Sequence, residues 1–215
     1  MNSRYWFLLA VVIGLLIWRH AATTPSPAPE SPAAASRHEV YCPPPPRVKP
    51  GDPPLQTPVP ASMQPVTLRG ATLKPLAGFS VDARVLSRMD YRADTMSDWV
   101  PLDLALGWGN MRRDDVLSRL HISQSNRWYF YRWHGTPPLP PREIIRSSAN
   151  MHLIPANAAV AREFAAIRQN DSVHIQGWLV ELTTHTGWRY RSSTTREDTG
   201  SESCELILVC SISRN

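Results

Sequence analysis

The sequence predicts a small α+β domain, built on a mostly antiparallel sheet or an OB-like barrel with two short helices. A transmembrane helix and a disordered proline-rich linker are predicted to precede it. Three observations support this: an uncharged apolar run over residues 5–18, a proline-rich stretch over 23–65, and alternating strand-like patterns after about residue 67. The predicted boundaries are an anchor over 1–22, a tether over 23–66 and a globular domain over 67–215.

The apolar run over residues 5–18 is the predicted membrane anchor. Its length alone would suit the core of a signal peptide, since spanning takes about 20 apolar residues. However, Arg19 and His20 occupy positions where signal peptidase needs small residues for a cut after Ala21 or Ala22. We therefore expect an uncleaved single-pass helix in the inner (cytoplasmic) membrane. The very short leading tail favours a C-terminal domain outside the cytoplasm.

The stretch over residues 23–65 is the predicted tether and contains fourteen of the 21 prolines. Proline fixes φ and removes a backbone donor, so such a segment favours an extended polyproline path rather than a core. At roughly 3.1 Å per residue it could span on the order of 130 Å. An inert linker is the favoured interpretation, and a ligand for a proline-binding module is the alternative.

The three cysteines leave the disulfide question open. Cys204 and Cys210 flank an apolar run, and if that run is one strand they lie about 20 Å apart, too far to pair. A bridge from Cys42 to the domain is conceivable in an oxidising compartment. Buried free cysteines are the favoured interpretation.

Periodicity assigns the elements of the domain. Alternation predicts strands, and stripes such as Val160, Phe164 and Ile167 predict helices, one of them opened by Asn157. Gly135 begins a rigid proline-rich loop. The predicted strands cover 78–88, 126–133, 143–147, 172–181, 187–193 and 204–212, and the predicted helices cover 110–120 and 157–168.

The strand over residues 126–133 is the most aromatic part of the chain. Alternation places Trp128, Phe130 and Arg132 on one face, with Tyr129 and its neighbours on the other. Tyrosine and tryptophan suit binding surfaces because their polar tips tolerate water. A strand covered on both faces would read the same way and is the favoured interpretation.

Four stretches carry a resemblance to a known family. They read PLDLALGWGNM (101–111), ISQSNRWYFYRW (122–133), PREIIRSSANMHLIPA (141–156) and RSSTTREDTGSESCELI (191–207). Together they resemble an uncharacterised family of bacterial membrane-anchored proteins, which implies an inner-membrane protein and brings no activity or catalytic residue with it. The helix, turn and Val-x-Ile-x-Gly strand over 167–177 is also similar to part of an OB-type barrel.

Two polar segments, 146–152 and 191–198, each begin Arg-Ser-Ser after a predicted strand. If those strand ends are neighbours, an anionic ligand could be bound there, and His152 with a serine and Asp198 would raise hydrolase chemistry. No Gly-x-Ser-x-Gly frame supports that chemistry. Turn and ion-pair roles are the favoured interpretation. The candidate binding residues are Arg146, Ser147, His152, Arg191, Arg196, Asp198, Trp128 and Tyr129.

The sequence therefore predicts a non-enzymatic envelope module that binds a protein or a cell-wall component. The alternatives are a periplasmic hydrolase using His152 and an OB-like nucleic-acid binder. From residue 67 onward there are 18 Lys and Arg against 15 Asp and Glu, with no basic stripe, which disfavours nucleic acid. No zinc-type spacing is present, and no cofactor or catalytic residue is predicted.

Overall fold

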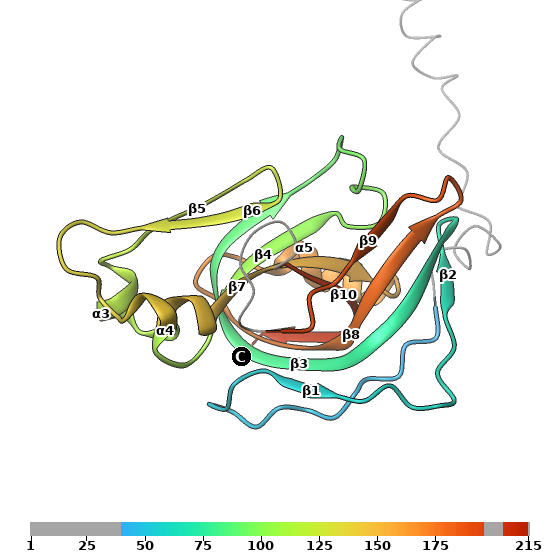
Figure 1. The fold of residues 1–215 in the computed structure, drawn as a ribbon, viewed down its shortest axis with the longest axis horizontal. Coiled ribbons are helices and arrows are strands. Elements are labelled where there is room, and N and C mark those ends of the chain that lie inside the picture. Colours follow the sequence, from blue (N-terminus) through green and yellow to red (C-terminus); the bar gives the residue numbers. More distant parts are fainter. Residues whose placement is uncertain (1–39, 196–203, 215) are drawn as a thin grey trace, which may run out of the picture. The chain divides into compact units, whose positions relative to one another are not determined.

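The computed structural model describes residues 40–195 and 204–214, which form a sheet-rich α+β domain (Figure 1). This confirms the predicted fold class at that level. The predicted anchor, the tether before residue 40, Arg196 and Asp198 lie outside the described residues. Within 40–195 and 204–214, no helix combines the length and the apolar character needed to cross a bilayer.

Ten strands and three α-helices make up the described chain. The strands are β1 (Leu55–Thr57), β2 (Val66–Leu68), β3 (Ala71–Asp90), β4 (Leu102–Gly107), β5 (His121–Ser125), β6 (Trp128–Arg132), β7 (Ser148–Pro155), β8 (Ser172–Thr184), β9 (Arg189–Arg191) and β10 (Glu205–Arg214). The helices are α3 (Asp114–Leu117), α4 (Pro141–Arg146) and α5 (Ala158–Ala166), with a short 3-10 helix η2 (Gly109–Arg112).

The main sheet closes on itself. Strands β3, β4, β7, β10 and β8 pair in that order, and β8 pairs again with β3. The β7–β10 pair is parallel, and the other pairs in the ring are antiparallel. The 20-residue β3 serves both neighbours because register shifts at Pro75/Ala77 and Val85/Ser87 let it bend.

The interior of the ring is filled by alternate residues of its strands, including Phe79, Leu104 and Leu153, all fully buried. Helix α5 adds Val160 and Phe164 to the same core, and Ile167, the residue that caps its C-terminus, joins them, as the sequence stripe predicts. Asn157 caps this helix by accepting a hydrogen bond from Val160 N at 3.0 Å. The predicted helix over 157–168 is therefore confirmed, with a shorter extent.

Other local predictions need correction. Residues 141–146 form α4 and not a strand, because Pro141 occupies the first helical turn, where its missing N–H costs nothing. Strands β4, β5 and β7 were not predicted. β4 and β7 are buried almost throughout, and the alternation of Leu102, Leu104 and Leu106 with Asp103 and Ala105 in β4 was a strand signal that the prediction did not use.

Residues 40–66 do not form a disordered tether in the structure. Leu55–Thr57 pairs with β3, and Val66–Leu68 pairs with the start of β3. The segment over 40–54, which we call the strap, lies along the barrel wall. The domain boundary predicted at residue 67 therefore falls too late, because proline-rich sequence excludes a helix but still permits docking against a sheet.

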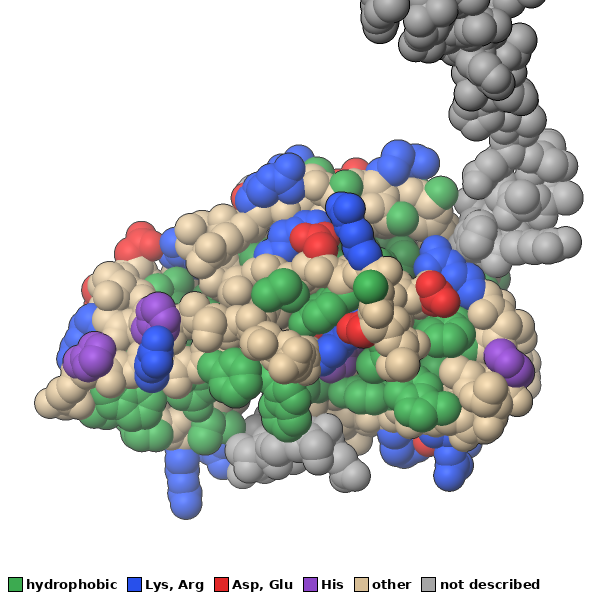
Figure 2. All heavy atoms as spheres, turned by 90° about the horizontal axis from the view of Figure 1, so that it is seen from above, with side chains coloured by type: hydrophobic (Ala, Val, Ile, Leu, Met, Phe, Trp, Pro, Cys, Tyr) green, Lys and Arg blue, Asp and Glu red, His purple; other side chains and the backbone are tan. Residues whose placement is uncertain are grey.

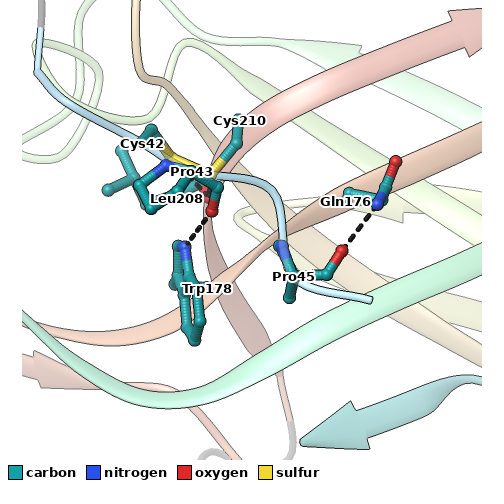
Figure 3. Close-up of a disulfide and its surroundings, with 7 residues drawn as sticks. All are labelled: Cys42, Pro43, Pro45, Gln176, Trp178, Leu208 and Cys210. Carbon is teal, nitrogen blue, oxygen red and sulfur yellow. Dashed lines mark hydrogen bonds between the residues drawn. A yellow bond between two sulfur atoms is a disulfide. The ribbon is translucent and has the colours of Figure 1, made fainter. Parts of the chain in front are cut away.

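The strap is held by a disulfide and by its own carbonyl groups (Figure 3). Cys42 bonds to Cys210 of β10, with 5.1 Å between the Cα atoms, which corrects the favoured interpretation of free cysteines for this pair. Cys204 is buried and takes no part in this disulfide. Trp178 Nε1 donates to Pro43 O at 2.9 Å, and Gln176 Nε2 donates to Pro45 O at 2.6 Å. The proline carbonyls thus accept hydrogen bonds from barrel side chains, although the prolines have no N–H to donate.

Candidate functional site

A buried polar cluster lies on the outer face of β4 and β7. Leu102 and Leu104 point into the barrel, so Asp103 between them points outward, yet it is fully buried. Asp103 Oδ1 lies 2.9 Å from His152 Nδ1 and accepts a hydrogen bond from Arg127 Nη1 at 2.9 Å. The carboxylate therefore lies between one histidine and one arginine, and the arginine donates the hydrogen bond.

Arg127 belongs to the tight turn between β5 and β6, and it fastens this hairpin to the barrel. Its guanidinium also forms a forked pair with Asp94 at 2.8 Å, donates to Val100 O at 2.9 Å, and lies 3.7 Å from the centre of the Tyr91 ring. The Arg127 hydrogen bond lowers the pKa of Asp94. Burial alone would lower the pKa of Arg127, but the hydrogen bond to Asp94 and the charges of Asp103 and Asp94 outweigh it, so the pKa is raised. The arrangement fixes a charged side chain in a largely dry setting.

The backbone of this turn is unusual. Asn126 and Arg127 have φ of 50° and 69°, a region that Asn tolerates and that usually favours Gly at the second position. The backbone strain at Arg127 is offset by the contacts of its side chain, which dock the hairpin on the barrel.

Two amides complete the docking. Asn150 on β7 donates to Arg127 O at 3.0 Å and to Asp103 Oδ2 at 3.3 Å. Gln124 on β5 donates to Asn150 Oδ1 at 2.6 Å. The hairpin consequently closes over the outer face of β4 and β7 through a chain of polar contacts.

His152 is covered on its other side by Tyr190 of β9. The two rings meet edge to face with centres 5.5 Å apart, and the His152 side chain is 2% exposed. Burial, followed by nearby anionic groups, raises the pKa of Tyr190. The structure thus gives His152 the partner Asp103, whereas the sequence suggested Asp198, which lies outside the described residues.

The serines of the two Arg-Ser-Ser segments bond to backbone or to tyrosine. Ser148 Oγ donates to Ile144 O and accepts from Tyr129 OH. Ser192 Oγ donates to Ser193 O and accepts from Leu206 N. These contacts match the turn roles favoured by the sequence.

The start of β10 brings the segment that begins at Arg191 near His152. Leu206 lies opposite His152 in the β7–β10 pair, and Ser192 bonds to the same Leu206. Arg191 pairs instead with Glu181 at 3.1 Å. Arg146 is exposed at the end of α4, and Ser147 O accepts from Trp108 N at 2.9 Å. The predicted residues are thus spread over two regions.

The hairpin has one open face. Trp128 and Phe130 of β6 are 39% and 50% exposed, opposite Ser125 and Ser123 of β5. Tyr129 and the other inward rings, Tyr131 and Trp133, pack against buried residues of α3, α4 and η2. The predicted alternation is confirmed, and the favoured interpretation of a strand covered on both faces is wrong. We call Trp128 and Phe130, with these serines, the aromatic face.

The residues that organise the cluster were largely missed by sequence reasoning. Asp103, Asn150 and Arg127 carry no motif, although a lone carboxylate within LDLALG was a usable signal. In residues 40–195 and 204–214, no group of three or more His, Cys, Asp or Glu is arranged to hold a metal ion.

Comparisons of the chain with protein-family models, with curated proteins and with solved structures find no match.

Proposed function

We propose that this chain is a non-enzymatic, membrane-anchored envelope protein whose domain binds a protein or a cell-wall component through the aromatic face. The predicted anchor over residues 5–18 would hold it in the inner membrane, with the domain outside the cytoplasm. The resemblance to bacterial membrane-anchored proteins supports this placement, and so does the Cys42–Cys210 bond, since stable disulfides belong to oxidising compartments.

The order of the strands in the closed sheet, β3-β4-β7-β10-β8, supports the proposal that the domain is an OB-type barrel. In that fold the face of the second and third strands binds extended ligands. The corresponding strands here, β4 and β7, are covered by the hairpin. A ligand would therefore meet the outside of the hairpin, and the aromatic face replaces the usual surface.

The single observation that carries the proposal is the exposure of two large aromatic side chains on a well-fastened hairpin. Interfaces are enriched in Trp and Phe, and their energy concentrates in a few such anchors. Trp128 and Phe130 lie two residues apart on one strand face, while the opposite face is packed. The rings are thus presented rigidly at little conformational cost.

The test uses the full chain in its native membrane. The variant Trp128→Ala/Phe130→Ala should reduce crosslinked partner capture, or pelleting with purified peptidoglycan, by about tenfold or more, as expected for two anchor residues. Trp188→Ala is the matched control, because Trp188 is 41% exposed but lies just before β9. Equal losses in both variants, or none in either, would contradict the proposal.

Two rival functions have separate tests. The ring order favours an OB-type nucleic-acid binder, but Figure 2, which looks onto the side that lies uppermost in Figure 1, shows basic side chains scattered among acidic ones rather than in a stripe. Affinity for a single-stranded oligonucleotide that falls steeply with salt would favour it. Hydrolase activity lost in a folded His152→Asn variant, with capture unchanged, would show catalysis instead.

A further inference from the structure

A concave site lies at the base of the hairpin, where β5 begins and β6 ends. It is a cavity of about 570 Å³, bordered by residues that precede β5 and by residues at the end of β6. This volume lies within the range typical of small-molecule sites. Figure 2 shows histidine and basic side chains gathering at the left end of the face.

The lining of this cavity is one-sided in charge. It contains Arg119, His121, Arg132 and His134, and no Asp or Glu. His121 and Arg132 are directly opposite in the β5–β6 pair, so their Cβ atoms are about 5 Å apart and both side chains leave the same exposed face. The two side chains therefore border the cavity side by side.

Seven other arginines of the described chain pair with carboxylates, whereas no such pair is formed by Arg119 or Arg132; the seven are Arg84, Arg88, Arg112, Arg113, Arg127, Arg191 and Arg214. Arg119 donates to the carbonyl of Thr136 at 2.9 Å, which orients the guanidinium without neutralising it. Arg132 makes no ion pair with any residue in the described ranges. The positive charge of the cavity is consequently left for an external anion.

We propose that this cavity binds a phosphate group. Guanidinium forks match phosphate oxygens, and a phosphate ester offers more acceptor oxygens and more charge than a carboxylate, which suits a cavity lined by two arginines and two histidines. Trp133 and Leu120 add an apolar wall for the group that carries the phosphate. A soluble phosphate ester and a phospholipid headgroup share this chemistry, and the proposal does not depend on the aromatic face.

The test measures binding of two probes to the full chain in detergent or nanodiscs. Glucose 6-phosphate represents the soluble source, and phosphatidylcholine vesicles with added phosphatidylglycerol represent the lipid source. Arg132→Gln should weaken binding of the effective probe by about tenfold, the scale of a charge-assisted hydrogen bond. Arg162→Gln, an exposed arginine of α5, removes the same charge and should leave binding unchanged.

Saturable binding of either probe that depends on Arg132 supports the proposal and identifies the source. No binding of either probe, or equal losses for Arg132→Gln and Arg162→Gln, would overturn it. Trp128→Ala/Phe130→Ala should leave phosphate binding intact, so a failure here is distinguishable from a failure of the proposed function.

Discussion

The strap and the hairpin both cover outer walls of the same barrel, yet they are fastened by different chemistry. The strap is joined by a disulfide, by carbonyl acceptors and by apolar contacts with Trp178 and its neighbours. The hairpin is fastened through Arg127, with Asp103 and Asp94 as its partners. A covalent bond responds to reductant, whereas an ionic network responds to protonation and to loss of one partner. Four predictions use this difference.

Removing Arg127 should have the largest effect. Arg127→Ala leaves the fully buried Asp103 without its strongest partner, and breaking a buried pair costs about 3–5 kcal/mol. The free energy of unfolding, measured with urea, should fall by that amount. Arg113→Ala, which breaks an exposed pair with Asp115, should leave stability essentially unchanged. Equal effects of the two changes would show that the network does not fasten the hairpin.

Breaking the disulfide should come next. The bond closes a loop with a sequence separation of 168, and removing a native disulfide typically costs about 2–5 kcal/mol. Reductant should also make the strap cleavable by trypsin after the exposed Arg47 while the hairpin stays protected. A Cys42→Ser/Cys210→Ser variant should show that cleavage without reductant. If reductant left the strap protected, packing and carbonyl bonds would be sufficient to hold it.

A smaller effect is expected at Gly78, where β3 passes beneath the strap. A Cβ there would lie 2.9 Å from Pro45 Cβ and also collide with Thr57 Oγ1, so the strap would have to shift. Overpacking of this kind costs about 1–3 kcal/mol. Gly78→Ala should lower the free energy of unfolding by that amount, and adding Thr57→Ala should recover part of the loss.

The smallest effect is a dependence on acid confined to the hairpin. Arg127 lowers the pKa of Asp94, so this pair stabilises the folded state above the ordinary aspartate pKa of about 3.9 and the contribution is lost as pH falls through the lower folded value. Hairpin amide shifts, followed by NMR from about pH 6 to about pH 2.5, should report loosening at the acidic end. Asp94→Asn should weaken that response, while the signals of Cys42 and of the strap residues close to it in sequence stay constant in both proteins.

Local signals in the sequence were sufficient for part of this molecule. The cap at Asn157 and the stripe of α5 are contained in one short segment, and so is the alternation of Trp128 with Tyr129. The closed ring depends on β10 entering between β7 and β8, a long-range pairing that no local pattern encodes. The strap was missed for the same reason, because its partners lie far along the chain.

The candidate site follows the same division. His152 was identified by residue type, but its partner Asp103 belongs to β4, far earlier in the chain, and a lone carboxylate in an apolar run does not indicate which side chain it will meet. The exposure of the aromatic face could not be read from alternation, which shows two faces without saying which is covered. Which face is covered depends on how Arg127 docks the hairpin on the barrel.

The place of β10 in the ring has a consequence for biosynthesis. Its parallel pairing with β7 and antiparallel pairing with β8 fill a slot that stays vacant until residues 205–214 have been made. A product cut short before this strand would carry two unpaired hydrophobic edges, which are templates for aggregation. Premature termination should therefore yield insoluble material that is cleared by proteases, rather than a shortened domain that retains partial function.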